Sequence, residues 1–491
     1  MEDFDELRRR LSHVNVKAPD YGDAYGALSL DGEDSSIELN GKIPLFDISH
    51  PGMFNLILNA AGSKIYIYKA LRTSMSFPSR TNDSYSIKLF PNIVIDNADA
   101  VDIEGNVRCI SFRLESWEKL FPYNYFEAMD IFGNITESQK KELEKFRYEF
   151  NKKEPFSPFN IYVFNDLGTI IEFQIDGRRY SISTEVRQSF GSRDRLDGQV
   201  RMIGTITFPH PVNLDHATDT CWDWRRFFNQ LSMGAFPFAG MAVSAGIGPT
   251  SPWGNVYLPL ERSTKLRRSS RSADAYHMPW NQWNERAAAG EAMQAWLKCQ
   301  EKRSFFRAAL DRVLARPGHV AIEDAVALCA GIDTLPELSS RDSLPTAVLD
   351  SMTQAAVSAA AKENFALDDV RIRGLLGSIQ NDDLRRRLRR LGSIAAPEVS
   401  EDALERWIDV IVPLRVFGAH GRIPKTDNNL IEGPAVDALA ALCARFDLQS
   451  AGVPDELSNN SFTLPRKEWD ESLMIMDMQR RFQENPEIDI N

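Results

Sequence analysis

Arg415 and His420 stand near the end of an apolar, helix-patterned stretch in the last quarter of the chain. Arginine carries a permanent positive charge that suits phosphate, and histidine titrates near neutral pH. Together they are the minimum set of groups needed to cleave RNA without a metal. On spacing alone, the alternative is an arginine that caps helix carbonyls and an exposed loop histidine.

The spacing of this pair predicts a site only under one structural condition. Five residues along an ideal helix place the two side chains about 140° apart, on different faces. The side chains converge only if the helix ends between them. Gly418 predicts that end, because glycine accepts the left-handed conformation at a helix C-terminus. Pro413, in the same stretch, predicts a kink or the start of a shorter helix.

A block of arginines lies just upstream of this stretch. It consists of Arg385, Arg386, Arg387, Arg389 and Arg390. Guanidinium groups match phosphate geometry, so the block predicts RNA-binding residues. An equally weighted alternative is a solvated helix face paired with Asp382 and Asp383.

Composition bounds the class of protein. A chain of 491 residues with 43% hydrophobic composition predicts two or three domains. A net charge of -12 argues against a protein that coats nucleic acid non-specifically, although a local basic site is compatible with it. The acidic N-terminus and the lack of an apolar run of roughly 18 residues predict a cytoplasmic protein with no membrane partner. The five scattered cysteines predict reduced thiols.

The hydrophobic period changes part-way along the chain. From about residue 24 to 210 apolar residues alternate, which predicts antiparallel strands separated by turns such as Asn40-Gly41 and Asp176-Gly177. A helix is expected at 137–151 and another at 219–233. Beyond residue 280 the period becomes 3.6, which predicts helices. Their expected ranges are 283–315, 321–329, 346–362, 370–391, 401–417 and 433–446.

These periods predict an α+β multidomain protein. The expected parts are a β-rich antiparallel N-terminal domain at 1–260, a basic linker at 261–275, an all-α helical-bundle domain at 276–464 and an acidic tail at 465–491. His50, His210 and His319 stand beside proline or glycine and are expected in turns.

Other catalytic classes are weakly supported. Ser244 lies beside glycines but lacks the GxSxG elbow of a hydrolase, and Gly246-Ile247-Gly248 lacks the lysine of a phosphate loop. No carboxylate cluster has metal-ligand spacing, so no cofactor and no metal are expected.

The Arg415-x4-His420 run, with the following segment 433–442 and the upstream segment 363–373, resembles the HEPN superfamily of helical ribonucleases. In the N-terminal half, the runs 24–41 and 109–117 look like the β-rich domain of ApeA-like bacterial anti-phage proteins, which carry a C-terminal HEPN domain. The similarity follows order and spacing over most of residues 20 to 450.

The resemblance implies abortive-infection defence by RNA cleavage. It implies that Arg415 and His420 act as catalytic residues in a composite cleft between two copies of the chain. The products would be a 2′,3′-cyclic phosphate and a 5′-hydroxyl end. The implied partners are RNA, with transfer RNA as one candidate, a second copy of the chain, and a phage-derived trigger sensed by the N-terminal domain.

One position departs from the family. A polar residue, commonly asparagine, often follows the motif arginine, whereas this chain has Val416. The alternative function is therefore a non-catalytic HEPN-like RNA-binding or dimerisation module.

Overall fold

The computed structural model describes most of the chain. The described residues are 1–19, 24–41, 53–60, 62–76, 85–102, 104–115, 117, 127–129, 161–163, 168–190, 196–248, 250–260, 286–315, 322–339, 346–363, 365–366, 368–378, 384–419 and 429–453. The basic linker at 261–275, the acidic tail and the helix expected at 137–151 therefore lie outside the described residues.

The N-terminal region consists mainly of strands, as the alternating period predicts. They are β1 (Val14–Ala18), β2 (Ala24–Ser29), β3 (Ser36–Gly41), β4 (Met53–Ala60), β5 (Ser63–Ser76), β6 (Tyr85–Phe90), β7 (Ile93–Ile95), β8 (Asn106–Leu114), β9 (Glu127–Met129), β10 (Ile161–Val163), β11 (Gly168–Ile175), β12 (Arg178–Phe190), β13 (Leu196–Asn213), β14 (Phe238–Ser244) and β15 (Gly254–Tyr257). A short helix, α1 (Phe4–Leu11), precedes them.

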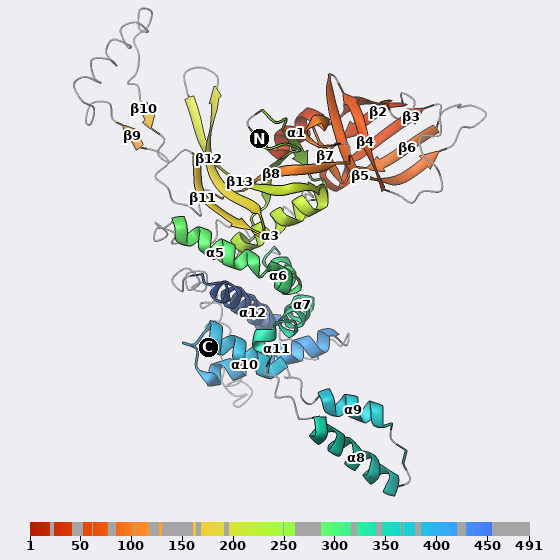
Figure 1. The fold of residues 1–491 in the computed structure, drawn as a ribbon, viewed down its shortest axis with the longest axis vertical. Coiled ribbons are helices and arrows are strands. Elements are labelled where there is room, and N and C mark those ends of the chain that lie inside the picture. The colour runs from red at the N-terminus through yellow and green to blue at the C-terminus, as the bar shows by residue number, and fades with distance from the viewer. Residues whose placement is uncertain are drawn as a thin grey trace, which may run out of the picture. The chain divides into compact units, whose positions relative to one another are not determined.

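Within the described part of the chain, thirteen of these strands form one antiparallel sheet. Its order is β11-β12-β13-β8-β14-β15-β7-β5-β4-β1-β2-β3-β6, and β6 also pairs with β5. This second pairing closes the strands from β5 to β6 into a ring, which is red and orange in Figure 1. Alternate residues of the ring point inward, and Leu28, Ile37 and Leu58 are fully buried there.

The turn expected at Asp176-Gly177 is confirmed. Both residues have positive φ, 49° and 75°, as the two-residue hairpin between β11 and β12 requires. The turn expected at Asn40-Gly41 is wrong, because both residues pair with neighbouring strands at the end of β3. Cross-strand pairing here outweighs the local turn preference.

His210 lies in β13, not in the expected turn. Prolines stand on both sides of it, and proline has no N–H to donate to a ladder. Pairing between β13 and β8 accordingly shifts register between Thr207 and Val212, and the strand continues past the interruption. His50 and His319 lie outside the described residues.

Helices dominate the C-terminal region, as the 3.6 period predicts. They are α5 (Arg286–Lys298), α6 (Gln300–Leu314), α7 (Ile322–Asp333), the 3-10 helix η8 (Pro336–Leu338), α8 (Thr346–Lys362), α9 (Asp369–Ser378), α10 (Leu384–Ala395), α11 (Glu401–Ala419) and α12 (Asn429–Ser450). A further helix, α3 (Leu214–Ser232), lies earlier in the chain, between β13 and β14. The stretch expected as one helix at 283–315 is two helices that meet at Cys299, and the stretch at 370–391 contains α9 and the start of α10.

Five helices, α6, α7, α10, α11 and α12, share one apolar core. Phe306, Leu388, Trp407 and Leu442 are each fully buried in it, and the indole N–H of Trp407 donates to the carbonyl of Ala435 over 3.0 Å. The core cysteines are free thiols, and burial raises the pKa of one of them, Cys329, to about 12. Such thiols act as small apolar groups, not as nucleophiles.

Two compact units divide the chain. The first comprises Met1–Cys221, Pro237–Arg262 and Trp280–Glu291, and the second comprises Trp222–Phe236, Ser263–Pro279 and Ala292–Asn491. The division falls within α3, so part of that helix belongs with the helical unit. No described helix combines the length and the apolar character needed to cross a lipid bilayer.

Candidate functional site

Arg415 lies near the C-terminal end of α11. This helix packs against α7, α10 and α12 and buries Trp407, Ile408 and Ile411 completely. The Arg415 side chain is 39% exposed, so its guanidinium can meet a ligand from solvent. The rigid core below the helix fixes the position from which this side chain extends.

Asp333, the last residue of α7, joins Arg415 to a second arginine. Arg415 donates from Nη2 to Oδ2 of Asp333 over 3.3 Å. Arg387 of α10 donates from Nη1 to the Asp333 carbonyl oxygen over 2.9 Å, and its Nε lies 3.8 Å from the carboxylate. Two cations from different helices therefore converge on one carboxylate that is itself 38% exposed. This group of three residues is named the Asp333 cluster below.

Gly418 does not end the helix in the way its residue type predicts. It lies inside α11, which continues to Ala419, and it is not among the glycines with positive φ. A Cβ at this position would lie 2.6 Å from Cγ2 of both Ile322 and Val326 of α7. The glycine therefore serves the close approach of α11 to α7, which is a tertiary requirement that the local sequence does not reveal.

We expect Gly418→Ala to destabilise the helical unit by about 1–3 kcal/mol, because the branched side chains of Ile322 and Val326 resist displacement. The matched control is Gly433→Ala in α12, where a Cβ meets no atom within 4 Å. That change should stabilise by roughly 0.5–1 kcal/mol, because alanine is the better helix former. Urea denaturation followed by circular dichroism measures both. If the two substitutions changed the free energy of unfolding in the same direction, the packing role of Gly418 would be contradicted.

His420 lies outside the described residues, and it follows directly on the last residue of α11. α11 is helical from Arg415 through Gly418 to Ala419, and the end expected before His420 lies outside the described residues. The structure therefore describes one member of the predicted catalytic pair.

The arginine block lies in the first half of α10, and its side chains contact neighbouring elements. Arg385 pairs with Asp409 and Arg389 with Glu405, both on α11. Arg390 donates to the carbonyl of Leu338 over 2.8 Å. Arg387 belongs to the Asp333 cluster, and Arg386 is exposed. The block therefore ties α10 to α11 and to the segment after α7, while Asp382 and Asp383 lie outside the described residues.

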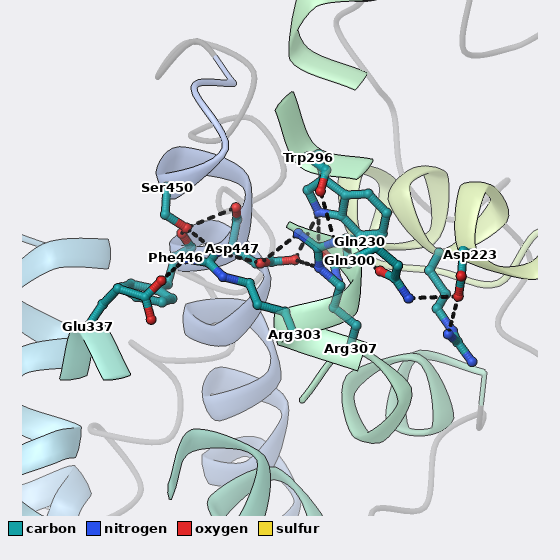
Figure 2. Close-up of polar contacts among 11 residues, drawn as sticks. Asp223, Gln230, Trp296, Gln300, Arg303, Arg307, Glu337, Phe446, Asp447 and Ser450 are labelled. Carbon is teal, nitrogen blue, oxygen red and sulfur yellow. Dashed lines mark hydrogen bonds and ion pairs between the residues drawn. The ribbon is translucent and has the colours of Figure 1, made fainter. Parts of the chain in front are cut away.

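A buried network of charges lies in another part of the helical unit (Figure 2). Arg307 of α6 donates to both oxygens of Asp447 of α12, from Nε over 2.7 Å and from Nη2 over 3.1 Å. Arg303, one turn earlier, donates to Asp447 over 2.8 Å, as does Nε1 of Trp296. Asp447 and Arg307 are both fully buried. One carboxylate thus joins three side chains from two helices to α12.

Further donors of the two arginines also have acceptors. Arg303 donates to Glu337 over 2.5 Å, and Arg307 donates to Gln300 over 2.9 Å and to the carbonyl of Trp296 over 3.0 Å. The Arg307 guanidinium carbon also lies 3.5 Å from the centre of the Trp296 ring. A network satisfied in this way fixes the helix arrangement, because each buried charge would be costly without its partners.

Burial and pairing move the pKa values of this network. Burial lowers the pKa of Arg307, and the charge of Asp447 opposes that shift. For Glu337, burial favours a higher pKa, but the hydrogen bond from Arg303 and its charge together hold the pKa below the usual value. The sequence pattern did not reveal these residues, because arginine in the middle of a helix is usually exposed.

Among the described residues no group of three or more histidine, cysteine, aspartate or glutamate side chains could hold a metal ion. Comparisons of the chain with protein-family models, with curated proteins and with solved structures found no match. The function therefore has to be inferred from the Asp333 cluster and from the residues beside it.

Proposed function

We propose that the chain is a metal-independent endoribonuclease of the HEPN type, acting in bacterial anti-phage defence, with Arg415 and His420 as its catalytic residues. The observation that carries the proposal is the Asp333 cluster, where the half-exposed guanidinium of Arg415 lies near a second arginine. Two cations with one carboxylate leave net positive charge, which suits the phosphate of an RNA backbone.

The chemistry follows from the two residue types. His420 takes the proton of a ribose 2′-hydroxyl, the 2′-oxygen attacks phosphorus, and the bond from phosphorus to the 5′-oxygen breaks. The protonated His420 then delivers a proton to the departing 5′-oxygen, and Arg415 stabilises the charge that builds on the phosphate. The products are a 2′,3′-cyclic phosphate and a 5′-hydroxyl end.

In this proposal a second copy of the chain completes the cleft, so the active particle is at least a dimer. The substrate is cellular RNA, with transfer RNA as the first candidate. The β-rich unit restrains the helical unit until it binds a phage-derived trigger.

The test is RNA cleavage in the presence of a metal chelator, with extract from infected cells supplying the trigger. The wild type should produce 5′-hydroxyl ends that accept a labelled phosphate, and Arg415→Ala and His420→Ala should not. If all three proteins give the same products, the enzyme proposal is wrong.

One observation favours a second function, a non-catalytic RNA-binding or dimerisation module. Val416, where related motifs carry a polar residue, is 42% exposed beside Arg415. An exposed apolar side chain suits a contact with a second copy better than it suits proton transfer. If RNA binding persists in both variants and no protein cleaves, this function is the correct one.

A further inference from the structure

A row of polar side chains crosses the outer face of the strand ring in the first unit. Tyr25 of β2 pairs directly with Lys17 of β1, Lys17 pairs with Asn59 of β4, and Asn59 pairs with Lys64 of β5. Directly opposed residues of antiparallel strands point to the same face. All four side chains are exposed. They are named the Tyr25 surface below.

A hollow of about 700 Å³ lies along this row. Its wall includes all four residues of the Tyr25 surface together with Asn15 and Ser63. The pairing explains the opening: β1 pairs with β2 along its whole length, but with β4 only at Lys17 and Asn59. The strands therefore part beside the turn between β4 and β5, and the hollow has the volume of a small-ligand site.

Among the described residues, the charges on this face are unbalanced. Lys88 of β6 lies on the same face and pairs with Glu38 over 3.3 Å. By contrast, within the part of the chain that the structure describes, neither Lys17 nor Lys64 has a recorded ion pair. The row therefore holds two exposed ammonium groups and, at its β2 end beside Lys17, a tyrosine that is 63% exposed.

We propose that the Tyr25 surface binds nucleoside phosphates, either free or as units of a single nucleic-acid strand. A base stacks on the Tyr25 ring, and phosphates contact Lys17 and Lys64. The amides of Asn15 and Asn59 provide hydrogen bonds to base or sugar. The row crosses three strand spacings, roughly 14 Å, and a base can reach the ring only when it is unstacked, which excludes a duplex.

This site goes beyond the proposed cleavage reaction and does not depend on it. It lies wholly in the first unit, whereas Arg415 lies in the second. It would give the β-rich unit a nucleotide or nucleic-acid ligand of its own.

Fluorescence anisotropy with a labelled single-stranded oligonucleotide tests the proposal. Every protein carries Arg415→Ala, so that binding is measured apart from cleavage. Tyr25→Ala should weaken binding about fivefold or more, and Tyr25→Phe should preserve it. Lys17→Ala combined with Lys64→Ala should weaken binding and reduce the slope of log affinity against log salt by about 1.4. Lys88→Ala is the matched control and should bind as the parent protein does.

Competition with mononucleotides separates the two sources of the ligand. If a mononucleotide displaces the oligonucleotide, the site binds free nucleotides. If it does not, the site binds a single nucleic-acid strand. The proposal is overturned if the parent protein does not bind, if Tyr25→Ala and the double lysine variant bind as the parent does, or if Lys88→Ala weakens binding equally. Thermal melting confirms that each variant is folded. Loss of cleavage in the Arg415→Ala parent leaves all these outcomes unaffected.

Discussion

Asp447→Asn is expected to destabilise the helical unit by about 3–5 kcal/mol, the largest stability loss of any single substitution proposed here. The carboxylate is fully buried and accepts hydrogen bonds from Arg303, Arg307 and Trp296. The change leaves two buried guanidinium groups without their shared anion. Such groups cannot deprotonate to escape the penalty, because the pKa of arginine is too high. Urea denaturation followed by circular dichroism measures the loss.

The control for this prediction is Asp350→Asn. Asp350 of α8 pairs with Arg373 of α9 over 2.7 Å, but its side chain is 52% exposed. At both positions an aspartate that pairs with arginine is changed to asparagine. The two positions differ in burial, because Asp447 is buried and Asp350 is exposed. The control should change stability by less than about 1 kcal/mol. Equal losses at the two positions would show that the buried network has no special structural role.

Arg307→Lys refines the same prediction. Lysine keeps the positive charge but cannot donate to both oxygens of Asp447 while it also reaches Gln300. The loss should lie between the Asp350 control and Asp447→Asn. A loss as small as that of the control would indicate that charge alone, and not the fork geometry, stabilises the network.

Arg415→Ala is expected to reduce the rate of RNA cleavage by about 10²–10³, because it removes a cation that stabilises the charge developing on the phosphate. Arg406→Ala is the matched control. Arg406 lies on the same helix and has its own carboxylate, Asp402, at 3.3 Å. The control should cleave at the wild-type rate. Cleavage by Arg415→Ala at the rate of the control would contradict a catalytic role for Arg415.

Asp333→Asn should act in the opposite direction. Asp333 holds the guanidinium of Arg415, so an RNA phosphate must compete with it. Without that charge, RNA affinity should rise by up to about fivefold, the value of an exposed ion pair. If the ion pair between Asp333 and Arg415 only stabilises the fold, Asp333→Asn and Arg415→Ala remove the same contact. Both variants should then show the same fall in unfolding midpoint and no gain in RNA affinity. Measurement of RNA affinity and unfolding midpoint for both variants separates these cases.

The kinds of secondary structure could be predicted from the sequence, and their boundaries only in part. The helix expected at 346–362 matches α8, and the alternating stretch from about residue 24 to 210 contains the strands β2 to β12. Both follow from a local hydrophobic period. Asn40-Gly41 was expected to turn and is paired at the end of β3, because the pairing partners come from distant strands.

The candidate site was predictable to the level of residue type. Arg415 could be chosen because a permanent cation beside a histidine suits RNA cleavage, and its half-exposed position supports that choice. Its partner Asp333 lies 82 residues away and carries no local signal. The arginine block was expected to bind phosphate or to form a solvated face, whereas several of its members contact neighbouring helices.

A strand-rich region followed by a helical one could be predicted from the chain's pattern of apolar residues, because their spacing is a property of short segments. Which charges pair depends on the tertiary structure. Asp447 meets Arg307 across 140 residues of chain, and Gly418 faces Ile322 and Val326 of another helix. It also brought Tyr25, Lys17 and Lys64 into one row, through pairing between separate strands. Such contacts depend on how elements pack and pair, and no single segment contains that information.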